Sequence, residues 1–266
     1  MPSTRCQTGP EPSAEPRAAF DATYFARNYP PSRFHAAGNK PAVNWALSRM
    51  LRRLCSRNGM GGRPAVIHFG CGQGFLARAC RRWSSNVGCD IALFAAGSAR
   101  ANGVAGVCAA MEAGCFRAGA FDAATAIDVL EHLDDPQAGL RTMCEALRPG
   151  GVALATVPNL GALSRRLKGR QWSGYRDRTH RSLAAPEQWG EWFRAAGFEV
   201  LRVGSDALWD PPYFCRRRGG LGGLGRLERA AILAASNLAM LVRPQWPWPL
   251  GDNLVATLRK PAREVE

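Results

Sequence analysis

A short apolar run that breaks into closely spaced glycines constrains the fold of this chain more than any other feature. Residues 66–69, VIHF, precede Gly70, Gly72 and Gly74, and a helix-like stretch follows. This pattern predicts a strand, a tight turn and a helix, with a turn that lets a ligand approach the backbone at the helix N-terminus. Phe75 occupies the position that a dinucleotide fingerprint reserves for its third glycine, so the pattern favours a nucleotide ligand without a pyrophosphate.

Strand-like and helix-like segments alternate over most of the chain. The expected strands are residues 64–69, 86–91, 104–109, 122–128, 151–157, 198–204 and 253–259. Helical periodicity occurs at residues 40–57, 74–83, 93–102, 136–147 and 186–196. Because strands that alternate with helices form a mostly parallel sheet covered on both faces, the sequence predicts an α/β fold.

Length and composition are those of one globular domain with additions. The chain has 266 residues, of which 46% are hydrophobic and 21% charged, enough for one sizeable core. Residues 1–17, rich in Pro, Ser and Ala, are expected to form a flexible tail, and residues 18–62 an N-terminal helical lead-in or lid. The main domain would be 63–266, with an insertion at 206–252 that caps the site.

The same composition bears on location and metal content. The longest apolar run, 230–242, is shorter than the roughly 20 residues that cross a bilayer. The N-terminus lacks a hydrophobic signal core, so we expect a cytoplasmic protein without a transmembrane segment. The nine cysteines form no C-x-x-C pair and no Cys/His cluster at zinc spacing, which predicts reduced cysteines and no metal site.

A formal net charge of +14 favours an acidic partner, which could be an acidic small molecule, a nucleic acid or an anionic membrane surface. The basic segments 164–170 and 215–220 are the candidate patches for a nucleic acid. However, no RNA-binding module is recognisable, and an arginine-rich composition also accompanies GC-rich genomes. We therefore expect a small-molecule substrate rather than a nucleic acid.

Three further motifs follow the glycines in order. Asp90 ends the second expected strand, where a carboxylate can accept hydrogen bonds from both ribose hydroxyls, although it could instead cap the next helix. FDAATAIDVLEHLDDP at 121–136 and LRPGGVALATVPN at 147–159 complete the set. Over residues 60–205 the chain resembles the class I S-adenosylmethionine-dependent methyltransferases, particularly their bacterial small-molecule branch.

The resemblance implies a Rossmann-like, seven-stranded, mostly parallel sheet with an antiparallel last strand, and S-adenosyl-L-methionine as cofactor. It further implies that Gly70–Gly74 wrap the methionine part, that Asp90 holds the ribose, and that Asp128–Leu130 lie under the sulfonium. Ile91 would flank the adenine. The full set of implied cofactor-binding residues is His68, Gly70, Cys71, Gly72, Gly74, Asp90, Ile91, Ala110, Met111, Asp128, Val129 and Leu130.

Two of these positions depart from the family's pattern. His68 stands where an acidic residue usually closes the first strand, and Ala110 where an Asp often contacts the adenine amino group. Without that carboxylate, backbone groups and packing would have to read the adenine, at a cost of about 1–2 kcal/mol in affinity.

The candidate catalytic residues are His132, His180 and Asp177. Methyl transfer requires the acceptor and the methyl group to be held in line, and a hydroxyl acceptor must also lose a proton, for which histidine is suited. His132 follows the fourth expected strand, and His180 lies in YRDRTHRS, which resembles a family loop over the cofactor, with Asp177 placed to orient it. Each histidine could instead be structural.

The sequence thus predicts S-adenosylmethionine-dependent methylation of a small molecule, at oxygen first and at nitrogen next. RNA or protein methylation, and cofactor binding without catalysis, are the alternatives. The segment DPPY at 210–213 resembles a signature of enzymes that methylate base amines. It follows the sixth expected strand rather than the fourth, so we interpret it as a rigid turn.

Overall fold

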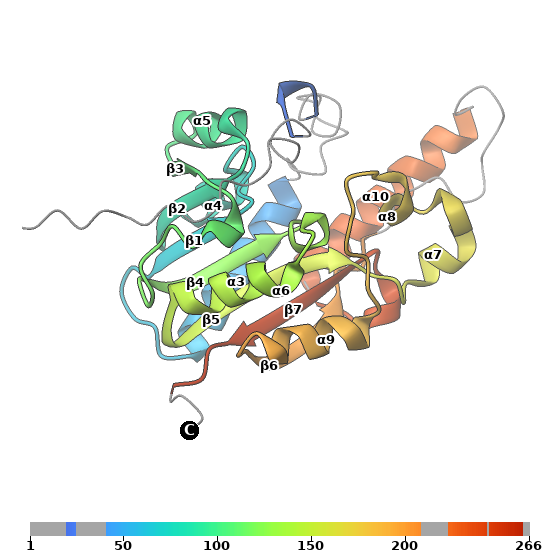
Figure 1. Cartoon of the computed structure of the whole chain (residues 1–266). Helices are drawn as coiled ribbons and strands as arrows, with labels where there is room; N and C mark the ends of the chain where they lie inside the picture. The colour runs from blue at the N-terminus through green and yellow to red at the C-terminus, as the bar shows by residue number, and fades with distance from the viewer. Residues whose placement is uncertain (1–19, 25–40, 209–222, 244, 263–266) are drawn as a thin grey trace, which may run out of the picture.

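The computed structural model describes residues 20–24, 41–208, 223–243 and 245–262 (Figure 1). The expected tail 1–17, the DPPY segment 210–213 and the basic segment 215–220 lie outside the described residues.

One seven-stranded sheet forms the centre of the molecule, with the order β3-β2-β1-β4-β5-β7-β6. Its strands are β1 (Ala65–Phe69), β2 (Ser85–Asp90), β3 (Ala105–Cys108), β4 (Phe121–Ile127), β5 (Leu147–Pro158), β6 (Glu199–Ser205) and β7 (Asn253–Arg259). The pairs among β1 to β5 are parallel, whereas β7 runs antiparallel to both β5 and β6. The predicted Rossmann-like α/β fold with an antiparallel last strand is therefore confirmed.

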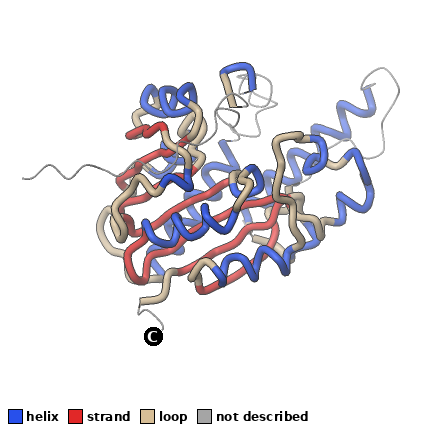
Figure 2. Tube along the Cα trace, in the orientation of Figure 1, coloured by secondary structure: helices blue, strands red, loops and turns tan. Residues whose placement is uncertain are grey.

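Helices cover both faces of this sheet (Figures 1 and 2). On one face lie α3 (Pro41–Arg57), α4 (Phe75–Cys80), α5 (Leu93–Ala101) and α10 (Gly223–Val242); on the other lie α6 (Pro136–Ala146) and α9 (Pro186–Ala195). Among the helices of the described residues, none combines the length and the apolarity needed to span a bilayer.

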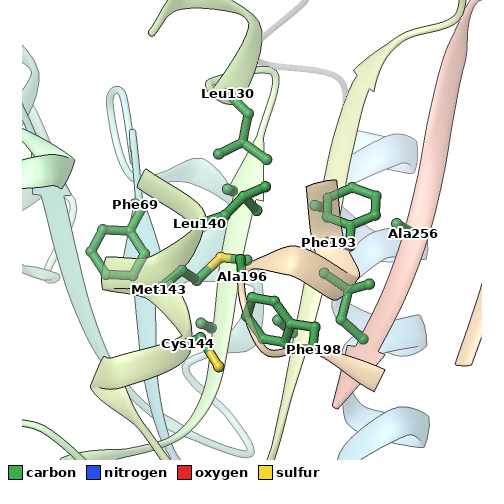
Figure 3. Packing of buried hydrophobic residues seen from close by; sticks show 14 of the residues in the cluster. Phe69, Leu130, Leu140, Met143, Cys144, Phe193, Ala196, Phe198 and Ala256 are labelled. Atoms are coloured by element: carbon green, nitrogen blue, oxygen red, sulfur yellow. The ribbon is translucent and has the colours of Figure 1, made fainter. Parts of the chain in front are cut away.

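Two apolar cores hold these layers together. Alternate residues of a strand point to opposite faces, so β1 sends Phe69 toward α6 and α9 and Val66 toward α3. Figure 3 shows the first core, in which Met143 of α6 and Phe193 of α9 pack beside the sheet. In the second core Leu51 of α3 packs with buried residues of β1, β4 and β5.

The structure differs from the sequence interpretation between β5 and β7. Short helices at α7 (Leu163–Lys168) and α8 (Ser173–Arg176) precede α9, and α10 occupies 20 residues of the segment 206–252, to which periodicity assigned no core element. Met240 of α10 is fully buried and belongs to the α3 core. Part of this segment therefore packs on the sheet face, and the capping role predicted for 206–252 stays a prediction.

Strand β5 also begins earlier than expected. Its pairing with β4 starts at Leu147, opposite Phe121, and then shifts so that Val152 lies opposite Ala123. The irregularity contains the Pro-Gly-Gly sequence at 149–151. Proline and glycine are uncommon inside strands, so the sequence pattern did not predict a strand there.

Candidate active site

The candidate site lies at the carboxyl edge of the sheet, where the strand order reverses. Strand β1 pairs with β2 on one side and β4 on the other, so the loops after these strands diverge and leave a crevice for a ligand. The loops that meet there follow Phe69 of β1, Asp90 of β2 and Ile127 of β4. The sequence motifs that predicted a cofactor thus converge on one edge.

The glycine loop after β1 requires glycine at positions 70 and 74. Gly70, Gly72 and Gly74 all have positive φ, at 57°, 51° and 79°. A Cβ on Gly70 would stand 2.2 Å from Val129 Cγ2, and one on Gly74 would stand 3.0 Å from the Cβ of Ala99 in α5. The loop backbone therefore approaches the loop after β4 closely, which fits a ligand cradled by backbone groups. The side chain of Cys71 packs against the buried cluster beneath α4 and α5.

Asp90 ties the glycine loop to the end of β2. Its Oδ2 accepts a hydrogen bond from the Gly72 amide at 2.8 Å, and its Oδ1 accepts one from the Ala92 amide at 2.9 Å. Burial raises the pKa of this carboxyl, and the two amide donors oppose that rise. Each carboxylate oxygen keeps a second acceptor site, which suits ribose hydroxyls. Helix α5 has Ala92 as its N-cap with no side-chain cap, so Asp90 does not cap this helix as the alternative proposed.

The predicted adenine rim follows β2 and β3. The amide of Ala109 donates to the Asp90 carbonyl at 3.0 Å, which brings Ala110 beside Ile91 at the same edge. Met111 opens a 3-10 turn, and its side chain is buried in the core beneath α6. The rim therefore offers backbone groups and small side chains, and its role toward adenine stays a prediction.

The residue after β4 is strained. Asp128 has φ 54° although it is not glycine, and Thr156 of β5 holds it there. The Asp128 amide donates to Thr156 O at 3.1 Å and to Thr156 Oγ1 at 3.0 Å, while the Thr156 hydroxyl donates to Asp128 Oδ1 at 2.7 Å. Strain of this kind gathers at ligand sites. Val129 then contacts Gly70, and Leu130 is buried in the core.

His68 lies apart from this edge, inside the sheet. It shares the strand face of Val66, and its Nδ1 lies 2.9 Å from Thr125 Oγ1 and its Nε2 3.0 Å from Asn86 Oδ1. Burial lowers the pKa of His68 to about 4, so the ring is neutral. Both ring nitrogens are therefore occupied by protein groups, which is the arrangement of a structural histidine.

The two candidate catalytic histidines meet beside a buried carboxylate. His132 ends the turn that follows β4, and His180 comes from the loop between α8 and α9, yet their ring centroids lie 4.8 Å apart. Glu131 Oε1 lies 4.0 Å from His132 Nε2 and 3.9 Å from His180 Nε2. The sequence predicted both histidines at the site but did not include Glu131. The feature that could have indicated it is a charged residue between Leu130 and His132, in a turn that is largely buried.

Backbone hydrogen bonds hold the two loops together. The amides of Arg181 and Ser182 donate to the Glu131 carbonyl at 2.8 Å and 2.9 Å, and the Ser182 hydroxyl donates to the Leu133 carbonyl at 2.8 Å. These bonds fix the loop that carries His180 against the turn that carries His132. The pairing explains how residues far apart in the sequence form one cluster.

Asp177 positions the cluster through Thr179. The Thr179 hydroxyl donates to Asp177 Oδ1 at 2.5 Å and lies 3.0 Å from His132 Nδ1. Burial alone would raise the pKa of Asp177, but the hydrogen bonds from Thr179 outweigh it and hold the pKa below its usual value. Asp177 Oδ2 is also 4.0 Å from His180 Nε2. Asp177 thus lies near His180 and is linked to His132 through Thr179, and its role in orienting His180 stays a prediction.

Burial controls the ionisation of the cluster. Burial, followed by the neighbouring His180, lowers the pKa of His132, so its ring is neutral at neutral pH. Burial, followed by the charge of Asp128, raises the pKa of Glu131 well above its ordinary value. The site therefore combines the neutral imidazole of His132 with the carboxyl group of Glu131, which is buried away from water.

Part of the N-terminal lead-in reaches this cluster. Phe20 packs edge-on against the His132 ring, with centroids 5.5 Å apart, and also against Tyr24. Both aromatic residues pack on the start of α5 beside Asp90. Trp172, just before α8, does not line the surface here: it is fully buried, and its Nε1 donates to Asp252 Oδ1 at 2.8 Å.

Comparisons with known proteins agree with this geometry. Residues 43–203 match the family described as methyltransferase domain. Over 181 residues the chain is 30% identical to the ubiquinone biosynthesis O-methyltransferase of Pseudomonas aeruginosa. The aligned region covers 62% of this chain and 73% of that protein.

Solved structures share the fold at low sequence identity. A possible histamine N-methyltransferase from Thermotoga maritima matches with a TM-score of 0.55 and 17% identity, covering 81% of this chain and 93% of that one. An S-adenosylmethionine-dependent methyltransferase from Archaeoglobus fulgidus matches with the same score and identity, covering 82% and 94%. The glycine cradle, the carboxylate at the end of β2 and these matches establish that the chain belongs to the methyltransferase domain family and is a class I enzyme that uses S-adenosyl-L-methionine.

Proposed function

We propose that this methyltransferase acts on a hydroxyl group of a small molecule, which binds beside His132 and His180. The observation that carries the proposal is the pair of imidazole Nε2 atoms that face one point next to Glu131. The relative from Pseudomonas aeruginosa is named an O-methyltransferase, which supports oxygen as the acceptor atom.

The hydrogen bonds of His132 prepare its ring to accept a proton. The Nδ1 atom lies 3.2 Å from the Thr179 carbonyl, and because a carbonyl oxygen only accepts, Nδ1 carries the hydrogen. The Nε2 atom therefore holds the lone pair. Since burial keeps the ring neutral, Nε2 can take the proton of a hydroxyl at neutral pH.

The rest of the site supplies position and exclusion of water. When bound, the cofactor supplies a methyl group made electrophilic by a positive sulfur. Gly70 to Gly74 and Asp90 would hold it at the crevice, with Asp128 to Leu130 beside the reacting end. Phe20 shields one side of the His132 ring from solvent. The acceptor oxygen would then lie between this ring and the methyl group, in the line that displacement requires.

The acceptor atom can be identified by following a labelled methyl group. The full-length protein would be incubated with methyl-labelled S-adenosylmethionine and with matched pairs of a phenol and an aniline, or a catechol and a diamine. We expect the label in methyl ethers, located by mass spectrometry of the product. Label found in amines or on carbon would overturn the assignment of oxygen.

A further inference from the structure

We propose that Glu131, His132 and His180 bind a divalent metal cation, most suitably a first-row ion such as Zn²⁺, Co²⁺ or Mn²⁺. The binding site stands on its own geometry, and its role in activating a hydroxyl rests on the proposed hydroxyl acceptor. With the metal bound, His132 Nε2 is a ligand, so the metal takes the place of the histidine as the group that activates the hydroxyl. Among the described residues, these three side chains are the group that brings three potential ligand atoms together, all within 4.8 Å of one another.

The separations within the cluster suit a cation better than direct hydrogen bonds. The Glu131 Oε1 atom lies 4.0 Å and 3.9 Å from the two histidine Nε2 atoms, beyond the roughly 2.7–3.2 Å of an N–H···O bond. Metal–nitrogen and metal–oxygen bonds of about 2.0–2.2 Å place neighbouring ligand atoms about 3–3.5 Å apart. Small side-chain rotations would close that difference.

Both histidines present a lone pair to the centre of the cluster. His180 Nδ1 lies 2.7 Å from the Gly174 carbonyl, and His132 Nδ1 lies 3.2 Å from the Thr179 carbonyl. Each Nδ1 therefore carries a hydrogen, and each Nε2 lies on the side of the Glu131 oxygen. A histidine that donates Nδ1–H to a backbone carbonyl and points Nε2 inward has the tautomer and orientation of a metal ligand.

Glu131 supplies the independent observation. Its side chain is 1% exposed, and its Oε2 atom is buried without a hydrogen-bond partner. The basic side chains nearest to this carboxyl group among the described residues are His132 and His180, whose Nε2 atoms lie 4.0 Å and 3.9 Å from Glu131 Oε1. Burial without a counter-charge disfavours the charged form of a carboxyl group by several kcal/mol. A bound cation would provide both the missing charge and the missing partner.

The ligand set indicates the kind of metal and its use. Two imidazoles and one carboxylate favour first-row ions over Mg²⁺ and Ca²⁺, which prefer oxygen ligands. Three protein ligands leave a coordination position open, as catalytic metal sites do. An acceptor hydroxyl at that position would release its proton to solvent more readily. Its oxygen would bond to the methyl carbon as the carbon–sulfur bond breaks, the electron pair passing to sulfur.

The test is metal binding by the full-length, untagged protein, without acceptor or methyl donor. Protein stripped with a chelator would be titrated with Co²⁺ and Zn²⁺ by absorption and calorimetry. Because Cys108 and Cys115 are exposed and could bind metal, the titration would use a background with both changed to Ser. We expect one equivalent to bind, with Co²⁺ bands that lack sulfur charge-transfer absorption.

Variants separate this site from adventitious binding. Glu131→Gln and His180→Gln should each weaken binding about 100-fold or more, whereas the exposed control Asp134→Asn should bind as the parent does. Metal should raise the melting temperature of the parent but not of Glu131→Gln, whose fold is checked by circular dichroism. No stoichiometric binding in the parent, or equal binding in both variants, would overturn the proposal.

Failure of the metal site and failure of the proposed function remain distinguishable. Stripped protein that methylates a hydroxyl at the full rate would reject the role of the metal in activating the hydroxyl and keep the proposed function. Protein that binds the metal at this site but methylates no hydroxyl would keep the metal site and reject the proposed function.

Discussion

Gly70 and Val129 are in direct contact across the point where the strand order reverses: a Cβ on Gly70 would overlap the Val129 side chain at 2.2 Å. This contact joins the loop after β1 to the loop after β4. The first loop carries the glycines predicted to cradle the methyl donor, and the second carries the strained Asp128 that leads to His132. We therefore expect a substitution at Gly70 to disturb both loops.

Gly70→Ala should damage both stability and cofactor binding. Its φ of 57° and the overlap with Val129 should together cost about 2–4 kcal/mol in the free energy of unfolding. Urea denaturation would measure this loss, and calorimetry the affinity for S-adenosylmethionine. Gly97→Ala is the matched control: it lies in α5 with open space around its Cβ, and should stabilise by about 0.5–1 kcal/mol. Equal stability of the two variants would contradict the packing argument.

Asp90→Asn should weaken S-adenosylmethionine binding about tenfold or more. The amide would place an NH₂ group against the amide hydrogen of Gly72 or of Ala92, and would remove a charged acceptor for the ribose. Calorimetry with the cofactor measures the loss. Asp134→Asn makes the same chemical change at an exposed position and should leave the affinity unchanged. If the dissociation constant of Asp90→Asn equals that of the parent, Asp90 does not hold the ribose.

His68 should make stability depend on acid pH. The unfolded histidine binds a proton below about 6.5, whereas burial lowers the pKa in the folded protein to about 4, so the unfolded state binds more protons in that window. Stability from this group is present above 6.5 and is lost as pH falls toward 4, by about 3 kcal/mol at most. Denaturation of the parent and of His68→Gln across this range checks it, because the partners Thr125 and Asn86 do not titrate. Parallel pH curves for the two proteins would contradict this account.

Much of the fold was predictable because the apolar pattern of each strand is visible in its local sequence. The seven strands have the alternating or continuous apolar character that a covered sheet requires, and each predicted strand is present. What the sequence did not predict are α7, α8 and α10. The first two are short, so they lack a full period, and Trp172 beside them is held by the distant Asp252 rather than by local contacts. Met240 of α10 is likewise buried by packing in the core that contains α3, which is distant in the sequence.

The site was predictable in its residues more than in its arrangement. The sequence selected His132, His180 and Asp177 from motif resemblance, and the structure brings them together. It could not show that Glu131 points into the same cluster, because the direction of a side chain in a single turn depends on tertiary packing. The same limit applies to His68, whose strand position suggested the cofactor shell but whose ring bonds Thr125 and Asn86.

The most direct test of the account is the turnover of His132→Gln and His180→Gln on a phenolic acceptor, measured with labelled S-adenosylmethionine alongside calorimetry of the cofactor. We expect each variant to keep its cofactor affinity within about threefold while turnover falls about 100-fold or more, because the histidines serve the acceptor and not the glycine loop. Full turnover in both variants would contradict the claim that this histidine pair activates the hydroxyl.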